Sequence, residues 1–315
     1  MTDIIYRYVN LTELFSILHD SQLKFTQLML MEDLNEGLGN VLSAQESFSY
    51  SWDLQRRKKI EEHHKRLKAI TYISCWTQEP DLMAMWLLYS KNKDAIRIKT
   101  TKDKLKEATC KFGRDHHYLN QLDASKGSIT LLSDPSVGSV KYVSFEEISQ
   151  RIKDKYDRYV RECVKSIDDN ISEEEKKILQ KNIRDIEDDR IIDLNESSFL
   201  KDKCFLHEKE LRASFRVYFR NEYSKEDWAK RHLDDINHLL GGSLIYEPEI
   251  VDLPKVIKVS INSDFIDAIC FDPRMPEYMR YDMLKIIELI NPNIVIEESE
   301  AFGYKLQKHD FSLIE

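Results

Sequence analysis

Hydrophobic and polar positions alternate almost without a break in residues 207–219, HEKELRASFRVYF. Successive side chains of a β-strand point to opposite faces, so this period of two predicts a strand. One face would carry the apolar residues Leu211, Ala213, Phe215, Val217 and Phe219. The other face would carry Glu208, Glu210, Arg212, Ser214 and Arg216. The charged row is either a solvated surface or the lining of a site.

Shorter periodic stretches before this strand predict a mixture of strands and helices. Residues 4–9 and 23–27 predict two short strands, and the helix between them would be capped by Asn10 or Thr12. In the following region the pattern predicts an irregular stretch at 28–40, a charged helix at 45–68 and a strand at 69–76. The helix predicted from Asp81 is nearly all apolar, so we expect it to be buried. A strand at 94–100, a helix from Thr101 and a strand at 137–145 follow it.

Residues 145–195 differ in character from the rest of the chain. They are dense in charge, and their isoleucines, leucine and valines recur at intervals of three and four, which predicts helices. The segment 168–172 interrupts the pattern, and Ser172 followed by three glutamates is a typical helix start. We therefore predict a helical hairpin inserted into a mixed domain. Its charged surface is either a solvated face or a surface that docks a partner.

The remaining pattern completes a chain without strict alternation of strands and helices. It predicts a helix from Ser224, a strand at 256–261, a strand or turn at 268–273, a helix at 276–290 and a strand at 293–301. This mixture is typical of the α+β class. We predict a single α+β domain over residues 1–315, with the hairpin at 145–195 inserted within it.

Composition narrows the class of protein further. The 315 residues are 42% hydrophobic and include 15 Tyr, 13 Phe and 4 Trp, which indicates a folded core and excludes a disordered chain. No run approaches the length of about 20 apolar residues that a membrane helix needs. Five scattered cysteines and a start without signal-peptide character favour the cytoplasm. A net charge of −9 argues against a global electrostatic grip on nucleic acid.

Common catalytic and metal-binding motifs are absent from the sequence. There is no phosphate-binding loop, dinucleotide-binding glycine pattern, zinc-protease motif or nucleophile elbow. The adjacent pair His63–His64 would point about 100° apart on a helix, which makes a poor metal clamp. Trp86 and Tyr89, three residues apart, would share a helix face and could border a pocket for a planar ligand. No metal site is predicted from these motifs.

Several short segments occur in a particular order along the chain: Tyr6-Arg7-Tyr8, Asp33 with Glu36, Met85-Trp86 with Tyr89, and Glu208 with Glu210 and Arg212. Taken in this order, they resemble a bacterial family known as domain of unknown function number twenty-nine seventy-one. Glu32 and Leu34 depart from the usual Asn and Pro of the family's turn, Asp94-Ala95 stands where a Gly is common, and Leu211 replaces the aromatic before Arg212.

Three further features follow one another along the chain: the basic Arg7 on the first predicted strand, the segment NLTELFSILHDSQL at 10–23, and the E-x-E of Glu208 and Glu210. This layout is similar, more distantly, to the ADP-ribosyltransferase fold. This resemblance implies a split, mixed sheet that holds NAD between its halves. It implies that Glu210 and Glu208 are catalytic. The last glutamate of the E-x-E strand, here Glu210, is expected to face the reacting carbon and stabilise the oxocarbenium that forms as nicotinamide leaves, while the other glutamate steadies a ribose hydroxyl or orients the acceptor. The residues expected to contact NAD are Arg7, Tyr8, Trp86, Tyr89 and Arg212, with Arg7 on the pyrophosphate.

The first functional hypothesis is a cytoplasmic ADP-ribosyltransferase or NAD glycohydrolase, acting as a toxin or effector that uses NAD to modify a protein or nucleic acid. Uncharacterised bacterial proteins of this kind often resemble effectors of defence systems. Anti-phage defence is therefore the expected setting, with a defence-system partner docked at the hairpin. The second hypothesis is a metal-dependent nuclease or hydrolase with four carboxylates as Mg²⁺ ligands, Asp33, Glu36, Glu208 and Glu210. The third is a non-enzymatic adaptor that docks its partner through the hairpin. Convergence of Arg7, Trp86, Tyr89 and Glu210 on one cleft would favour the first.

Overall fold

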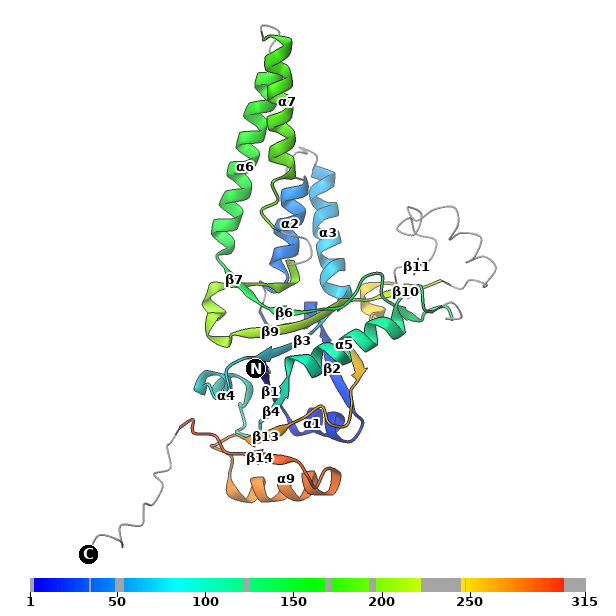
Figure 1. The fold of residues 1–315 in the computed structure, drawn as a ribbon, viewed down its shortest axis with the longest axis vertical. Helices are drawn as coiled ribbons and strands as arrows, with labels where there is room; N and C mark the ends of the chain where they lie inside the picture. The colour runs from blue at the N-terminus through cyan, green and yellow to red at the C-terminus, as the bar shows by residue number, and fades with distance from the viewer. Residues whose placement is uncertain are drawn as a thin grey trace, which may run out of the picture.

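A mixed β-sheet lies at the centre of the computed structural model, which describes residues 3–33, 35–48, 54–121, 125–167, 171–192, 197–221, 245–246 and 248–302 (Figure 1). Within these residues the sheet has nine strands. They are β1 (Ile4–Val9), β2 (Gln22–Gln27), β3 (Thr71–Thr77), β4 (Ile96–Thr101), β6 (Ser136–Ser139), β9 (Glu210–Arg216), β12 (Val256–Ser260), β13 (Ala268–Phe271) and β14 (Val295–Glu297). The β13–β14 pair is parallel, and the other pairs described are antiparallel.

The sheet divides into two arms at β3. One edge of β3 is paired with β9 along its whole length, from Thr71 opposite Arg216 to Thr77 opposite Glu210. The other edge pairs with β2 at one end and with β1 at the other, where Thr77 lies opposite Tyr6. One arm continues from β2 to β12, and the second continues from β1 through β4 and β13 to β14. The predicted α+β class and mixed sheet are confirmed, and the ADP-ribosyltransferase-like fold stays a prediction.

Helices and two small sheets surround the large sheet. The helices are α1 (Leu11–Leu18), α2 (Leu38–Phe48), α3 (Leu54–Ile70), α4 (Met83–Tyr89), α5 (Lys102–His116), α6 (Phe145–Ser166), α7 (Glu173–Asp188) and α9 (Glu277–Ile290), with the 3₁₀ turns η1 (Leu28–Leu30), η2 (Ser197–Phe199), η3 (Lys203–Glu208) and η5 (Ile250–Asp252). The small sheets contain β5 (Ile129–Thr130), β10 (Tyr218–Arg220) and β11 (Ile245–Tyr246) in one, and β7 (Lys141–Val143) and β8 (Leu200–Asp202) in the other. No helix in the described ranges is both long enough and apolar enough to cross a membrane.

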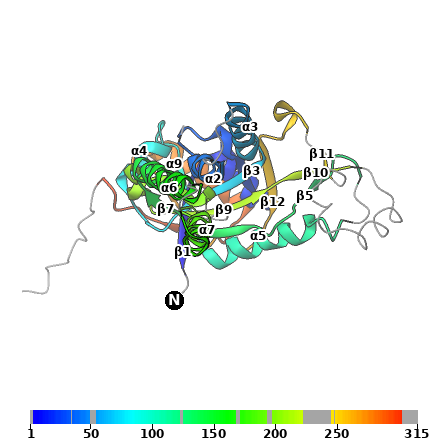
Figure 2. The same cartoon turned by 90° about the horizontal axis from the view of Figure 1, so that it is seen from above.

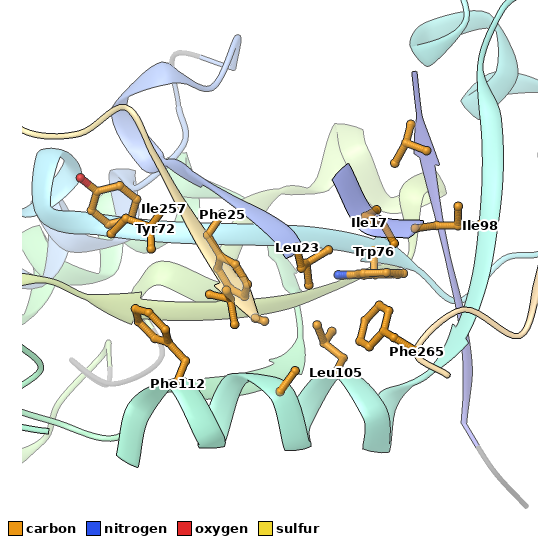
Figure 3. Packing of buried hydrophobic residues seen from close by; sticks show 14 of the residues in the cluster. Ile17, Leu23, Phe25, Tyr72, Trp76, Ile98, Leu105, Phe112, Ile257 and Phe265 are labelled. Atoms are coloured by element: carbon orange, nitrogen blue, oxygen red, sulfur yellow. The ribbon is translucent and has the colours of Figure 1, made fainter. Parts of the chain in front are cut away.

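The main hydrophobic core lies on one face of the sheet, beneath α1, α5 and α9. Figure 3 shows Leu105 and Phe112 of α5 pointing toward the strand residues Phe25 and Trp76. The Phe112 ring lies 4.8 Å from the ring of Phe215, one of the five apolar residues predicted for a single strand face. All five belong to this core, namely Leu211, Ala213, Phe215, Val217 and Phe219. The apolar side of the alternating pattern is therefore confirmed.

Side-chain caps fix where several helices begin. Asn10 accepts a hydrogen bond from the Glu13 amide at 2.8 Å, so the predicted helix at this position is confirmed with Asn10 as its cap. Thr101 caps α5 in the same way. Ser172 and Glu175 form a reciprocal capping box at the start of α7, as the Ser-Glu-Glu-Glu sequence predicted. These local hydrogen bonds satisfy backbone N–H groups that have no partner within the helix.

The predicted helical hairpin is present as α6 and α7. The two helices lie side by side and project away from the large sheet, beyond α2 and α3 (Figures 1 and 2). The side chains that α6 buries are near its start: Phe145, Ile148, Ile152 and Lys155. None of the α7 side chains is buried. The base of the hairpin is thus packed against the protein, and its distal half is exposed.

The predicted boundaries differ from the structure at two helices. The single helix predicted for 45–68 is two helices, and α2 begins at Leu38 within the stretch predicted to be irregular. Gly37 precedes it with a φ of 74°, a left-handed turn that glycine adopts without strain. The helix predicted from Asp81 begins at Met83 and is not wholly buried, because Met83, Leu87, Leu88 and Tyr89 are each about half exposed. The helix predicted from Ser224 lies outside the described residues.

The strand predicted for 207–219 is also shorter than its pattern. Residues up to Glu208 form the turn η3, where Asp202 accepts a hydrogen bond from the Cys204 amide at 2.9 Å. Lys209 has a φ of 40°, so the chain reverses there, and β9 begins only at Glu210. Glu208 and Glu210 therefore do not lie on one strand face. An alternating sequence cannot signal a left-handed residue, because that conformation depends on the contacts around it.

Candidate functional site

The charged face of β9 is buried, and Arg212 lies at its centre. The Arg212 side chain has no exposed surface. Its Nε donates a hydrogen bond to Oε1 of Glu210 at 2.8 Å, and its two terminal nitrogens bind both oxygens of Glu36 at 2.9 and 3.1 Å. One of these nitrogens also donates to the carbonyl of Ser198 at 2.6 Å. A guanidinium with this two-oxygen grip is a strong and directional ion pair.

Lys201 brings a second cation to the same carboxylates. Its Nζ lies 2.6 Å from Oε2 of Glu208, 3.1 Å from Oε2 of Glu210 and 3.5 Å from Oε1 of Glu36. We call Glu36, Lys201, Glu208, Glu210 and Arg212 the charge cluster. Its carboxylates exceed its cations by one, so the cluster carries one excess negative charge when all five groups are ionised. Each of its side chains is at most 9% exposed.

Neighbouring elements fix the backbone around the charge cluster. In the β7–β8 pair, Tyr142 lies opposite Lys201, and the Tyr142 hydroxyl accepts a hydrogen bond from the Glu210 amide at 2.7 Å. The Thr77 hydroxyl donates to the Glu208 carbonyl at 2.6 Å. One of these hydrogen bonds comes from β7 and the other from β3, and together they hold the backbone of Glu210 and Glu208. The two glutamates therefore meet at one ammonium although they belong to different elements.

The two glutamates differ in how firmly their charge is held. Burial alone would raise the pKa of Glu210, but Arg212 and Lys201 lower it to about 2. Burial raises the pKa of Glu208, and Lys201 opposes this only in part. Within the described chain, Glu208 accepts a hydrogen bond through Oε2 alone, from Lys201. Glu208 is therefore the carboxylate of the cluster that retains an oxygen for a further donor.

Tyr8 and Tyr89 lie beside the cluster on the same face of the sheet. Tyr6 and Glu210 both lie opposite Thr77, and the alternation of β1 places Tyr8 on the Tyr6 side. The rings of Tyr8 and Tyr89 are 6.2 Å apart and inclined by 21°. Burial at its phenolic end, followed by the charge of Glu208, raises the pKa of Tyr89. Since Tyr89 is also 52% exposed, it links the cluster to the surface.

Trp86 is placed in the core instead of at a ligand surface. It is completely buried, its ring lies 4.7 Å from that of Tyr8, and its Nε1 donates to Asp81 at 2.8 Å. Asp81 also accepts hydrogen bonds from Ser299 and from the backbone amide of Glu300. A ligand cannot stack on a ring with no exposed surface. The helical spacing that paired Trp86 with Tyr89 did not reveal which of the two would be covered.

Arg7 does not converge with Glu210. Adjacent strand residues point to opposite faces, so the Arg7 side chain lies on the face of the sheet opposite to Tyr8. There it forms an ion pair with Glu13 at 2.6 Å and donates hydrogen bonds to the Ser74 hydroxyl and, at 3.4 Å, to the Lys24 carbonyl. Arg7 thus joins the two arms of the divided sheet, and the sheet separates it from the charge cluster. Arg7 therefore does not meet the condition that would favour the first hypothesis, namely that it shares a cleft with Glu210.

Arg212 is likewise turned inward, and two residues of the site carried no sequence signal. The hydrogen bonds of Arg212 run to protein acceptors, so the expected contact with NAD has no support in this arrangement. Lys201 and Tyr142 were missed because each lies in a short strand of the β7–β8 pair. Nothing in their local sequence distinguishes them from solvated lysine and tyrosine residues. Their role arises from a pairing between distant segments.

The carboxylates proposed as metal ligands surround an ammonium. Glu36, Glu208 and Glu210 meet at Lys201, whereas Asp33 accepts a hydrogen bond from the nearby Asn35 amide. Among the described residues, no group of three or more His, Cys, Asp or Glu side chains is arranged to hold a metal ion. The arrangement therefore favours charge stabilisation by fixed carboxylates over ligation of Mg²⁺.

No protein family, no curated protein and no solved structure matches the chain. The resemblance to domain of unknown function number twenty-nine seventy-one therefore stays a prediction. The function is therefore inferred from the geometry of the charge cluster and of its aromatic neighbours.

Replacing Arg212 with Met is expected to lower the free energy of unfolding by about 3–5 kcal/mol, because the buried carboxylates would lose their main partner. Arg216→Met, on the same strand but partly exposed, is the matched control and is expected to cost less than about 1 kcal/mol. Urea unfolding of both variants measures the difference. Equal losses for the two variants would contradict the central role of Arg212.

Acid is expected to weaken the fold through Glu210. Its pKa falls from 4.5 to about 2 on folding, so its stabilising contribution is complete above 4.5 and is lost as the pH drops toward 2. The parent should therefore lose more stability between these pH values than Glu210→Gln does. Urea unfolding across this range tests this, with Glu249→Gln as an exposed control that keeps the parental slope. An unchanged slope in Glu210→Gln would refute the assignment.

Proposed function

We propose that the protein cleaves NAD and transfers its ADP-ribose group, using the surface between Glu208 and Tyr89 as the active site. One observation carries the proposal: Glu208, with an oxygen left for a ligand, lies within hydrogen-bond distance of the same ammonium as the fixed Glu210. Tyr89 extends from this point to the surface and offers its ring to a planar group. A carboxylate suits the positive charge that develops on the ribose, and an aromatic ring suits the planar nicotinamide.

The reaction places a demand on the site that a carboxylate meets. The bond between the ribose anomeric carbon and the nicotinamide nitrogen breaks, and nicotinamide leaves with the bonding electrons. Positive charge then develops on the ribose, as in glycoside cleavage, and a fixed carboxylate beside it lowers the barrier. An acceptor hydroxyl, amine, amide or water forms the new bond to this carbon and loses a proton. The proton passes to Glu208 or to solvent.

The two glutamates have separate roles in this proposal. Glu210 is held ionised by Arg212 and Lys201, so it keeps a constant negative potential and positions Lys201. Glu208 contacts the ribose through its remaining oxygen, and its raised pKa suits proton acceptance from an acceptor. Arg212 acts behind Glu210 as a positioning residue. This division differs from the expectation that Glu210 itself faces the reacting carbon.

The acceptor in this proposal is a protein or a nucleic acid, and anti-phage defence in the cytoplasm is its proposed setting. Both rest on the family resemblance of the sequence segments. In the part of the chain that the structure describes, the carboxylates of the nuclease hypothesis form no metal-ligand group. Because the hairpin is exposed, the adaptor hypothesis is the alternative, and the next experiment distinguishes it from the proposed enzyme.

Glu208→Gln is expected to reduce NAD cleavage at least about 100-fold, because the amide cannot carry the negative charge that faces the ribose. The measurement is nicotinamide release, together with transfer of label from adenylate-labelled NAD to components of a host lysate. Glu147→Gln, an exposed carboxylate near Lys203, is the control with parental activity. Folded parent protein that releases no nicotinamide and transfers no label would sink the proposal and favour the adaptor.

Tyr89→Ala is expected to raise KM for NAD about tenfold with a smaller change in kcat, since a stacking contact stabilises bound substrate and transition state alike. Initial rates over a range of NAD concentrations measure both constants. Leu87→Ala, which removes another half-exposed side chain of α4, is the matched control. An equal rise of KM in both variants would place the nicotinamide elsewhere.

A further inference from the structure

The segments at both ends of the helical hairpin contain residues that belong to the charge cluster or bind it. Tyr142, which accepts the hydrogen bond of the Glu210 amide, lies on β7 just before α6. Ser198 and Lys201, which bind Arg212 and the glutamates, lie in η2 and β8 after the chain has returned from α7. The hairpin is therefore inserted between residues that form the cluster. Any change in how its base is seated acts on them directly.

A buried ion pair joins the hairpin to helix α2, which follows the cluster residue Glu36. Glu36 lies directly before α2, and Glu46 lies within it. Lys155 of α6 donates to Glu46 at 2.8 Å, with the two side chains 2% and 1% exposed. Lys155 also donates to the Asp189 carbonyl at 2.6 Å, and Glu46 accepts from the Ile191 amide at 2.8 Å. The pair thus binds α2, α6 and the chain leaving α7.

Apolar packing joins the same elements. A second hydrophobic cluster, separate from the main core, contains Leu42, Phe145, Ile148, Ile152, Ile192 and Leu200. These residues come from α2, the base of α6, the chain after α7 and β8. A buried charge pair and a packed core both resist partial separation, because an unpaired buried charge or a void is costly. The base of the hairpin, α2 and β8 therefore move together or not at all.

We propose that the hairpin α6–α7 controls the charge cluster, with Lys155 and Glu46 as remote positioning residues. The pair holds α2 against α6 and the chain after α7, and the second hydrophobic cluster joins β8 to them through Leu200. Through α2 and β8 they fix Glu36 and Lys201, which in turn set the positions of Glu208 and Glu210. The exposed distal half serves as the lever, since none of the α7 side chains is needed to fill a core. The inference rests on the proposed function only for its enzymatic consequence, namely that displacement of the hairpin changes the activity.

Two readouts report on the cluster without NAD. Cys75 lies opposite Arg212 on β3 and is partly exposed, so its alkylation rate depends on how tightly the cluster is closed. The backbone amides of β9 exchange with deuterium at a rate that depends on the hydrogen bonds of this region, including that from Glu210 to Tyr142. Peptide mass spectrometry resolves Cys75 from the other cysteines.

Lys155→Met is expected to raise the Cys75 alkylation rate about tenfold and to accelerate exchange in β9, while exchange in the distant strand β12 stays parental. Lys155→Arg, which keeps the charge, should restore values close to the parent. Lys176→Met, which breaks an exposed pair with Glu173 on α7, is the matched control without effect. Ile152→Val, a milder change at the same base, should shift both readouts in the same direction by less.

Two results would overturn the inference. One is faster exchange confined to α2 and the hairpin with parental values for Cys75 and β9. The other is an equal acceleration in β9 and β12, which would show general loosening of the fold. Neither outcome depends on NAD chemistry, so this test and the test of the proposed function fail separately.

Discussion

The burial of the Arg212 guanidinium constrains the rest of this structure. A cation without exposed surface is tolerated only when anions and carbonyls satisfy it, and Arg212 obtains them from Glu36, Glu210 and Ser198. These partners come from segments far apart in the chain. The excess of carboxylate then requires Lys201, which β8 brings from behind the hairpin. One buried charge therefore determines how the sheet, α2 and the hairpin base are joined.

The same arrangement separates charged groups that are paired within the protein from a carboxylate that keeps an oxygen for a ligand. Arg7, Arg212 and Glu210 are all engaged by protein partners, and Arg7 lies on the far face of the sheet. Glu208 has an oxygen without a partner in the described chain, and its charge helps to raise the pKa of Tyr89, a side chain that reaches the surface. A site built in this way holds its negative potential before any ligand arrives. Such preorganisation is the main way in which proteins stabilise charge that develops during a reaction.

The sequence predicted the elements more accurately than their surroundings. Alternation identified β9 and its core-facing residues, because a strand with one buried apolar face requires a period of two. Capping residues located the starts of α1, α5 and α7, since their hydrogen bonds form within one turn. The turn at Lys209 and the break between α2 and α3 were missed. The left-handed conformation of Lys209 depends on contacts elsewhere in the protein.

The sequence by itself determined the α+β class, the apolar face of β9, the hairpin and the pair of glutamates that the candidate site uses. Periodicity and capping express local geometry, which a short segment specifies alone. Only the tertiary structure decided that the polar face of β9 is buried, that Lys201 and Tyr142 join it, and that Arg7 lies across the sheet. Those outcomes follow from strand pairing and from charge compensation between distant segments. Neither of these produces a repeating pattern in the local sequence, so sequence periodicity cannot predict them.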